Sequence, residues 1–585
     1  MRILKTGGTI MPTIAEAIIE RLIRAGVKRI YGVCGDSLNG FTDCIRQNKE
    51  IEWIPVRHEE TAAFAAGAEA HVTNSLVVCA GSCGPGNLHL INGLYDCFRN
   101  RVPVLAIAAH IPTAEIGTRY FQETHPEHLY QECTTFCERV TSPEQLPHVL
   151  ETAIQTATSL STVSMIIISG DIALMPALES KTKLPIHRSH SFTCPADKNL
   201  EEVAQILNQA NKVAIFGGAG CAGSHEVLLK TAEKLKAPII HTLRGKEFIE
   251  YDNPFDVGMT GLLGFSSGYQ AMMNCDVLLL VGTDFPYRQF YPQDAKIIQI
   301  DSRPENIGRR APVDYGLVGD VQTTLNALNP KLEIKNDQSF LQTSLENYQS
   351  ARKGIDDLAV GYPGKKPIHP QYVAKVVNEL ANTDAIFTCD VGTPTIWAAR
   401  YLKMNGKRRL LGSFNHGSMA NAVPQALGAQ IAFPGRQVIA FSGDGGFSML
   451  MGELLTLRQL KVPVKIVIFN NGAYGFVELE MKAAGILEFA TQLDNPNFAK
   501  MAEAVGVFGV RVENPEDLEE GIKNAFDHPG PAIIDVVVNR LELSMPPKIT
   551  LQDVYGFNLW MAKAVLDGRG SEVIDLAKTT LFRNF

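Results

Sequence analysis

Apolar and polar positions along the chain follow two alternating periodicities. Residues 14–25 carry apolar side chains at helical spacing, with Thr13 placed to cap a helix and Gly26 placed to end it. Short continuous apolar runs occur at residues 165–168 and 277–281. Such runs are far shorter than the roughly 20 residues that cross a bilayer, and they indicate buried parallel strands. The alternation of the two patterns predicts an α/β fold.

The pattern repeats in three blocks separated by polar, turn-rich stretches. A chain of 585 residues suggests four domains at about 150 residues each, but the predicted strands cluster into three blocks. We therefore predict three doubly wound parallel-sheet domains followed by a tail of amphipathic helices. The expected boundaries are an N-terminal extension at 1–11, domains at 12–180, 198–340 and 369–540, linkers at 181–197 and 341–368, and the tail at 541–585.

Composition and charge exclude several classes of protein. The chain is 45% hydrophobic and 20% charged, which is typical of globular proteins and excludes disordered, collagen-like and coiled-coil chains. Its formal net charge of −8 gives no basic field for a nucleic acid backbone, so no nucleic acid partner is expected. The 11 cysteines include no CxxC pair, which indicates reduced thiols and a cytoplasmic protein.

The clearest chemical signal lies in the third block, where two predicted strands end in polar residues. The strand at 438–441 runs into the GDGG sequence at 443–446, and the strand at 466–469 runs into two asparagines. Open α/β sheets bind ligands at the carboxyl ends of their strands. Carboxylate and amide oxygens suit Mg²⁺, and glycines let backbone N–H groups approach phosphate oxygens. We expect Asp444 and Asn471 to form a magnesium and phosphate site.

The sequence GDG, followed by 24 residues and two asparagines, is the cofactor signature of thiamin diphosphate enzymes. The chain resembles that superfamily across residues 12–540, and within it the pyruvate oxidase branch, most closely the quinone-linked pyruvate dehydrogenases. The other stretches that carry the resemblance are 35–40, 57–60, 81–87, 120–125 and 414–419.

This resemblance implies a role for each matching residue. Asp444, Asn471 and the Ala473 carbonyl would hold Mg²⁺, Glu59 would hydrogen-bond the pyrimidine ring of the cofactor, and Met419 would wedge the cofactor into its bent shape. Further cofactor contacts would come from Gly417, Ser418, Gly445, Gly446, Gly472, Tyr474, Gly475, Phe476 and Val477. The residues that match substrate-side positions, each of which alone could equally be an ordinary core or loop residue, are Phe121, Gln122, Phe476 and Glu480.

The second block contains a motif with two interpretations. Residues 218–223 fit the GxGxxG pattern after a strand, which alone suggests NAD, but His241 stands at the next strand end, where NAD enzymes carry an acid. The resemblance implies FAD instead, although some thiamin diphosphate enzymes keep this domain without a flavin. The implied FAD contacts are Gly218, Gly220, Thr260, Gly261, Leu262, Leu263, Thr283, Asp284, Phe285, Pro286, Tyr287 and Asp301.

The C-terminal tail has helical apolar spacing at residues 551–567 and 572–582. Helices of this kind can lie in a membrane interface or pack on their own domain. The resemblance implies lipid binding by the tail, and hence a cytoplasmic protein peripherally associated with the cytoplasmic face of the inner membrane. It also implies a homo-oligomer, a dimer at least and usually a tetramer, in which the first and third domains of different copies share the cofactor.

Together these features predict a flavoprotein oxidoreductase that converts pyruvate to acetate and CO₂ with thiamin diphosphate, Mg²⁺ and FAD, and passes electrons to ubiquinone. One alternative is a phosphate-dependent pyruvate oxidase that makes acetyl phosphate with O₂. Another is an acetolactate synthase or a non-oxidative decarboxylase. A third is a catalytically silent, membrane-associated scaffold, but such a relative would have no reason to keep Glu59, Asp444 and Asn471 together.

Overall fold

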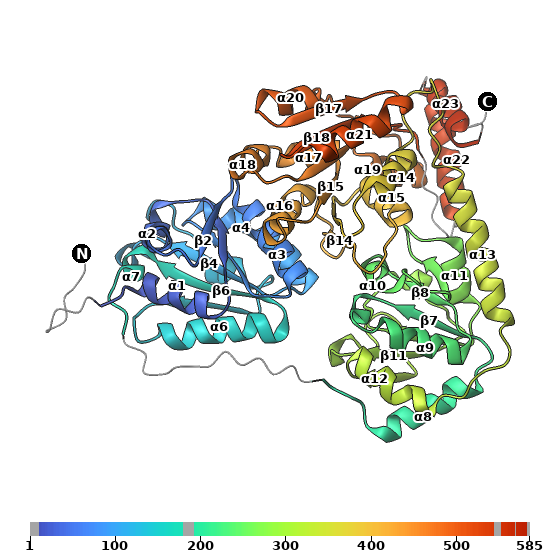
Figure 1. Cartoon of the computed structure of the whole chain (residues 1–585), viewed down its shortest axis with the longest axis horizontal. Coiled ribbons are helices and arrows are strands. Elements are labelled where there is room, and N and C mark those ends of the chain that lie inside the picture. Colours follow the sequence, from blue (N-terminus) through green and yellow to red (C-terminus); the bar gives the residue numbers. More distant parts are fainter. Residues whose placement is uncertain (1–10, 179–191, 543–550, 568, 582–585) are drawn as a thin grey trace.

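The computed structural model describes residues 11–178, 192–542, 551–567 and 569–581. Most of the expected N-terminal extension, residues 181–191 of the first expected linker and residues 543–550 of the tail therefore lie outside the described residues. The described chain contains three six-stranded parallel sheets covered by helices, which confirms the predicted α/β fold. In Figure 1 the first domain is blue to cyan, the middle domain is green, and the third domain is yellow to red.

The first domain has the strand order β2-β1-β3-β4-β6-β5. Its first helix begins as expected, because the Thr13 hydroxyl accepts a hydrogen bond from Glu16 N while the Glu16 carboxylate accepts one from Thr13 N. Its strands are β1 (Arg29–Gly32), β2 (Glu52–Pro55), β3 (Val77–Gly81), β4 (Val104–His110), β5 (Phe136–Val140) and β6 (Val163–Ser169). Its helices are α1 (Ile14–Arg24), α2 (Asn39–Gln47), α3 (Glu59–Thr73), α4 (Pro85–Asn100), α5 (Pro126–Leu129), α6 (Leu146–Leu160) and α7 (Gly170–Ala173).

The middle domain has a different order, β12-β11-β10-β7-β8-β9, in which the direction of strand addition reverses between β7 and β10. This is the order of dinucleotide-binding doubly wound sheets. Its strands are β7 (Val213–Gly217), β8 (Ile239–His241), β9 (Asp256–Met259), β10 (Val277–Val281), β11 (Lys296–Asp301) and β12 (Tyr315–Val318). Its helices are α8 (Asp197–Gln209), α9 (His225–Leu235), α10 (Lys246–Ile249), α11 (Ser266–Met273) and α12 (Val321–Leu328), and α13 (Ser339–Asp356) leads to the third domain.

The third domain repeats the topology of the first, with the order β14-β13-β15-β16-β18-β17. Its strands are β13 (Ile386–Cys389), β14 (Arg409–Gly412), β15 (Val438–Gly443), β16 (Lys465–Asn470), β17 (Phe508–Val512) and β18 (Ala532–Val537). Its helices are α14 (Pro370–Leu380), α15 (Thr393–Tyr401), α16 (Ala422–Ala432), α17 (Asp444–Met449), α18 (Glu453–Leu460), α19 (Gly475–Ala483), α20 (Phe498–Ala504) and α21 (Leu518–Asp527).

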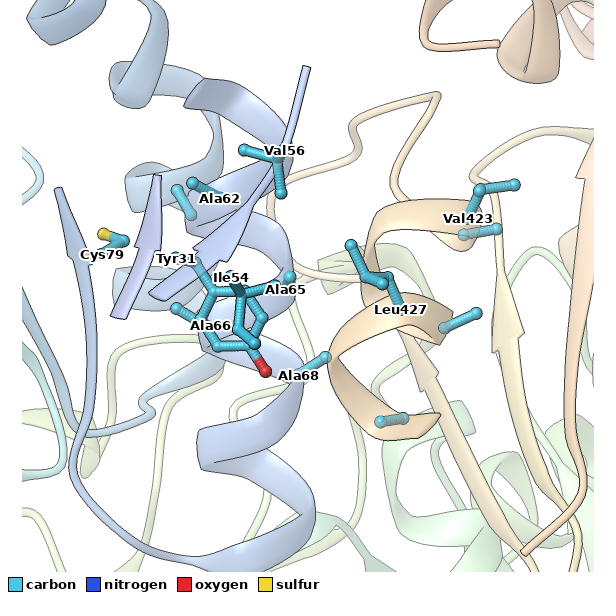
Figure 2. Packing of buried hydrophobic residues seen from close by; sticks show 14 of the residues in the cluster. Tyr31, Ile54, Val56, Ala62, Ala65, Ala66, Ala68, Cys79, Val423 and Leu427 are labelled. Atoms are coloured by element: carbon cyan, nitrogen blue, oxygen red, sulfur yellow. The ribbon is translucent and has the colours of Figure 1, made fainter. Parts of the chain in front are cut away.

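Helix α3 of the first domain packs against α16 of the third domain, and almost all of its surface is buried. Twelve of its 15 residues are buried, and six of these are alanines. The small side chains let α4 and α16 approach closely: a Cβ on Gly93 of α4 would lie 2.5 Å from Ala63 Cβ, and a Cβ on Gly428 of α16 would lie 2.1 Å from Ala65 O. Figure 2 shows Leu427 of α16 pointing toward α3. One hydrophobic core therefore crosses the boundary between the two domains.

The tail forms two helices, α22 (Leu551–Leu566) and α23 (Gly570–Leu581), and α22 packs on α19 of the third domain (Figure 1). Trp560 is fully buried, and its Nε1 donates to Glu488 Oε2 at 3.1 Å. Burial alone would raise the pKa of Glu488, but the Lys482 ammonium 2.7 Å away and the Trp560 hydrogen bond lower it to about 2. The described part of the tail thus packs on its own domain. No helix in the described ranges has the length and apolarity needed to span a membrane.

The contact between α3 and α16 predicts a specific sensitivity to added volume. Gly428→Ala should destabilise the protein by about 1–3 kcal/mol, because the new methyl group would overlap the Ala65 backbone and the helices would have to separate. The same substitution at an unconstrained helical position would be stabilising. Gly435→Ala, just beyond α16, is the matched control because a Cβ there meets no atom within 4 Å. Chemical denaturation of both variants checks this, and equal stability would contradict the close packing.

Candidate active site

The strand order of the third domain brings Asp444 and Asn471 to the same edge of the sheet. Strands β15 and β16 are neighbours, with Gly443 paired to Phe469, and Asp444 and Asn471 follow them directly. The Asp444 side chain is only 2% exposed. Its Oδ2 accepts hydrogen bonds at 2.7 Å from Gly472 N and from Asn495 Nδ2, and its Oδ1 accepts one from Gly445 N at 3.0 Å. The turn requires glycine at 472, where φ is +67°.

The electrostatics of Asp444 fit a divalent cation. Burial raises the pKa of Asp444 to about 6, although hydrogen bonds from Gly472, Gly445 and Asn495 oppose this. All three of these donors are neutral groups, so the buried carboxylate gains most from a bound cation. Asn471 Oδ1 lies in the adjacent turn, where it accepts a hydrogen bond from Ala473 N at 3.1 Å. The glycine-rich turn beside it would bring backbone N–H groups to the oxygens of a diphosphate held by that cation.

The other predicted diphosphate-side residues lie around this edge. The two loops touch, since a Cβ on Gly445 would lie 2.6 Å from the ring of Tyr474. Phe476 and Glu480 lie on α19, which begins immediately after this turn. The predicted residues at the start of α17 and along the turn into α19 are Gly445, Gly446, Gly472, Ala473, Tyr474, Gly475, Phe476 and Val477.

Two residues at this edge were missed by the sequence reasoning. Asn495 links Asp444 to Asn470, because its Nδ2 lies 2.7 Å from Asp444 Oδ2 and 3.0 Å from Asn470 Oδ1. Asp390 follows β13 and is buried against the glycine-rich turn, where a Cβ on Gly446 would lie 2.6 Å from its Oδ2. The signal for Asp390 was present, since it is an acid directly after an apolar strand. Asn495 follows no strand, and no comparable signal marks it.

The predicted pyrimidine-side residues occupy the boundary between the first and third domains. Glu59 begins α3, is buried, and its Oε2 lies 2.9 Å from His89 Nδ1. Ser418 Oγ accepts a hydrogen bond from Asn92 Nδ2 at 2.9 Å, and the same amide donates to Glu60 Oε1 at 2.7 Å. Asn92 therefore links the segment containing Gly417, Ser418 and Met419 to the start of α3.

The carboxylates of Glu59 and Asp444 make their described hydrogen bonds within separate domains of one chain. Glu59 contacts His89 of the first domain, whereas Asp444 contacts only residues of the third. The structure of one chain therefore does not join the predicted pyrimidine-side glutamate to the predicted metal ligand.

The substrate-side predictions fall on two surfaces. Phe121 is 77% exposed, and Gln122 beside it has a φ of +63°. Glu480 is exposed on α19, and burial together with the Glu480 carboxylate raises the pKa of Tyr287 in the middle domain. The predicted substrate-side residue Glu480 and the predicted flavin residue Tyr287 therefore interact electrostatically.

The glycine-rich loops of the middle domain meet where its strand order reverses. Gly218 follows β7, and Gly282 and Thr283 follow the neighbouring β10. A Cβ on Gly218 would lie 2.6 Å from Gly282 O, and a Cβ on Gly220 would lie 2.7 Å from Gly282 Cα. Only glycine permits this approach, and it forms the switch point at which doubly wound sheets bind dinucleotides.

Several polar groups near this switch point fit a dinucleotide. The Thr260 hydroxyl is buried and has no hydrogen-bond partner among the described residues. Asp301 ends β11 and accepts hydrogen bonds from Arg303 N at 2.9 Å and Asn306 Nδ2 at 3.0 Å through Oδ1 alone. β8 ends at His241, a buried histidine whose pKa is lowered to about 4 by burial and Lys246, so the acid typical of NAD sites is absent from that position. The remaining predicted flavin residues lie on two touching loops, at Gly261, Leu262, Leu263 and at Asp284, Phe285, Pro286, Tyr287.

Basic residues near these loops were not predicted from the sequence. Arg310 Nε lies 2.7 Å from Asp284 Oδ1, and Arg101, which follows α4 of the first domain, has its Nη2 3.7 Å from Asp284 Oδ2. Arg244 lines a small cavity together with Ala219 of the glycine-rich loop. Positive charge beside glycine-rich loops suits a diphosphate. Arg101 comes from another domain, so only the tertiary fold reveals it.

Comparison with known proteins identifies the family. The N-terminal, central and C-terminal domains of thiamine pyrophosphate enzymes match residues 12–129, 200–328 and 390–536. The chain is 36% identical over 572 residues to the putative thiamine pyrophosphate-containing protein YdaP of Bacillus subtilis, which covers 97% of this chain and 98% of the relative. The chain belongs to the thiamine pyrophosphate enzyme family.

Two other relatives of this thiamine pyrophosphate enzyme carry names for specific reactions. It is 30% identical over 531 residues to the pyruvate oxidase of Lactiplantibacillus plantarum, covering 89% of this chain and 88% of the relative. It is 31% identical over 561 residues to the probable acetolactate synthase large subunit of Methanocaldococcus jannaschii, covering 91% and 93%. The family is therefore one of thiamine pyrophosphate-dependent decarboxylating enzymes, with thiamine pyrophosphate (thiamin diphosphate) as its cofactor, and its two terminal domains are the cofactor-binding ones.

The position of Asp444 predicts how the cofactor is retained. Asp444→Asn should weaken Mg²⁺-supported binding of thiamine pyrophosphate by about 100-fold, because the amide has the same shape but removes the buried negative charge. Asp494→Asn is the control, since Asp494 is an exposed acid in the neighbouring loop. Isothermal titration of the cofactor with Mg²⁺ measures both variants. Equal affinities for the wild type and Asp444→Asn would contradict a metal ligand at this position.

Proposed function

We propose that this enzyme oxidatively decarboxylates pyruvate to acetate and CO₂, with Mg²⁺ and FAD as further cofactors and ubiquinone as the electron acceptor. The observation that carries this proposal is that the candidate flavin loop at residues 260–263 contacts the third domain. Arg400, at the end of α15, donates from Nε to Leu263 O at 3.1 Å, and Leu263 packs against the same hydrophobic core of the third domain as Phe476 of α19. A flavin bound at this loop would therefore lie against the domain that carries the substrate-side helix.

The cofactors and the chain have separate tasks in this proposal. When bound, thiamine pyrophosphate supplies a nucleophilic carbon and an electron sink for decarboxylation, and FAD accepts two electrons. Asp444, Asn471 and the Ala473 carbonyl hold the metal that neutralises the diphosphate. Glu59 holds a proton at its carboxylate beside the pyrimidine ring, and its hydrogen bond to His89 Nδ1 fixes the orientation of that carboxylate.

The substrate side needs one polar contact and an apolar surround. Gln122 offers a neutral amide to the carboxylate of pyruvate, while Phe121 and Phe476 exclude water. The overall reaction balances as pyruvate, water and ubiquinone giving acetate, CO₂ and ubiquinol. The carbon–carbon bond to the carboxylate breaks, water supplies the second acetate oxygen, and two electrons with two protons reach the quinone.

The proposal includes assembly of at least two copies, with a tetramer as the expected form. No described hydrogen bond joins Glu59 to Asp444 within one chain, and in this proposal a second copy supplies the domain that completes the cofactor site. The large exposed ring of Phe121 is consistent with burial in such an interface.

The proposal also places the enzyme peripherally on the cytoplasmic face of the inner membrane through its tail. The support is a set of exposed apolar side chains on the outer surface of α22 and α23, namely Val565, Leu566 and Ile574. With a net charge of −8 on the chain, apolar burial is the expected source of lipid affinity.

The names of the relatives suggest two alternative reactions. A phosphate-dependent pyruvate oxidase would release acetyl phosphate, and an acetolactate synthase would join two pyruvate molecules without net oxidation. The contact between the candidate flavin loop and the third domain favours an oxidative reaction over the second. The apolar tail favours a membrane quinone over O₂.

The proposed function predicts that pyruvate changes the absorbance spectrum of the bound flavin. The purified protein with thiamine pyrophosphate and Mg²⁺ should show a flavin spectrum that pyruvate bleaches without oxygen and that a soluble ubiquinone analogue restores. The reaction should yield acetate in equal amounts with and without phosphate. Glu59→Gln should abolish bleaching yet keep the flavin, because the amide cannot hold the exchangeable proton. Flavin that pyruvate leaves oxidised, or products that are acetyl phosphate or acetolactate, would contradict the proposal.

Lipid binding by the tail predicts a second outcome. The double variant Leu566→Ser and Ile574→Ser should bind phosphatidylglycerol-containing vesicles about 100-fold more weakly than the wild type, because burial of two large apolar side chains is worth about 3 kcal/mol. Both side chains are exposed, so the fold should persist. Leu160→Ser, at an exposed position at the end of α6, is the control. Co-sedimentation measures all three proteins, and equal binding would contradict membrane association through this surface.

A further inference from the structure

Cys83 lies in the turn between β3 and α4 and contacts the predicted substrate-side residue Gln122. Its side chain is 5% exposed, and its Sγ lies 3.2 Å from Gln122 Oε1. A thiol is a weak donor, and of the two ends of a carboxamide only the oxygen accepts a hydrogen bond. The contact therefore fixes which end of the Gln122 amide faces Cys83.

The backbone around this contact allows little freedom. Gln122 has a φ of +63°, a left-handed conformation that costs a residue with a side chain about 1 kcal/mol, and Gly84 opposite it has a φ of +66°. A Cβ on Gly84 would lie 2.7 Å from Gln122 Cβ, so the two loops are in van der Waals contact. Glu123 closes the loop at residues 117–123, which contains Gln122, by accepting a hydrogen bond from Gly117 N at 2.5 Å. Strained residues held by close packing of this kind are concentrated at functional sites.

Two serines of the same domain hold Cys83 in place. Its backbone N–H donates to Ser37 Oγ at 3.0 Å, and Ser37 Oγ lies 2.9 Å from Ser82 Oγ. The thiol is thus a fixed donor, and the amide it contacts belongs to a fixed loop. With Oε1 facing Cys83, the NH₂ group of Gln122 is the end that is presented to a ligand.

We propose that Cys83 is a positioning residue that orients the Gln122 amide so that its N–H groups bind the carboxylate of a 2-oxo acid substrate. The inference rests on the proposed function, because it takes Gln122 as a substrate contact. Without the thiol, the amide can rotate and present its oxygen, which repels an anionic substrate. Nothing in this role requires Cys83 to react, and the thiol is hydrogen-bonded and buried.

The test is steady-state turnover of pyruvate by the holoenzyme with an artificial electron acceptor. Cys83→Ala should raise the KM for pyruvate about three- to tenfold, while kcat changes less than twofold, because the chemistry is untouched. Cys83→Ser keeps a donor and should restore KM to within about twofold of the wild type. Cys133→Ala, which removes another buried thiol of the same domain, should leave KM unchanged.

Two further variants test the orientation without altering Cys83. Gln122→Glu keeps an oxygen for the thiol but presents a second oxygen to the substrate, so it should raise KM more than Gln122→Ala does. In the double variant of Cys83→Ala with Gln122→Ala, the loss should equal that of Gln122→Ala alone, since the thiol acts only through the amide.

The outcomes separate this inference from the proposed function. If the wild type fails to turn over pyruvate, the proposed function fails and this inference fails with it. If the wild type is active but Cys83→Ala matches it, or Cys83→Ser is no better than Cys83→Ala, the inference alone is overturned. Additive losses in the double variant, or a Gln122→Glu enzyme with a KM no higher than that of Gln122→Ala, would also overturn it.

Discussion

The close crossing of α3 and α16 is the contact on which the candidate site depends. Backbone meets backbone there, since only glycine at 428 fits against Ala65 O. Glu59 is the first residue of α3, so the separation of the two helices sets the position of its carboxylate relative to the third domain. The third domain also fixes the entry to α3 directly, because the buried Glu453 accepts a hydrogen bond from Arg57 N at 3.1 Å. The predicted proton-handling residue is thus aligned by a domain that does not contain it.

Apolar packing at this crossing stabilises the contact between the helices, but it is not directional and does not fix how they align. Buried hydrogen bonds beside the crossing fix that alignment. Gln425 of α16 donates to Asp96 of α4 at 2.9 Å. Burial raises the pKa of Asp96 to about 7, although this and other hydrogen bonds oppose the shift. Asn100 donates to Gly412 O of the third domain, and its own carbonyl accepts from Arg244 of the middle domain at 3.1 Å. Asn100 therefore contacts both other domains, which makes the C-terminal end of α4 the point where all three meet.

The sequence predicted what depends on local periodicity and on the ends of strands. The α/β class followed from the alternation of helical and apolar stretches, and Asp444 and Asn471 followed from the rule that parallel strands deliver their next residues to one edge. Asp390 obeys the same rule and could have been found. Arg101 and Asn495 could not, because each reaches its partner through the tertiary fold rather than through a strand end. Amphipathic spacing in the tail likewise indicates that one face is buried but cannot say against what.

Helix α19 lies between the tail, which packs on it, and the predicted cofactor-binding turn at residues 471–474, from which it begins. It begins after the turn at Ala473, carries Phe476 and Glu480, and lies so close to α22 that a Cβ on Gly556 would be 2.0 Å from Ala483 O. Removing the tail would therefore expose α19, take the Trp560 ring away from the Lys482 ammonium, and remove the hydrogen bond that Trp560 Nε1 donates to Glu488. Loss of activity in a truncated protein would then report damage to α19 as readily as loss of lipid contact. Substitution of exposed tail residues avoids this ambiguity, since those side chains contribute to the outer surface and not to the contact with α19.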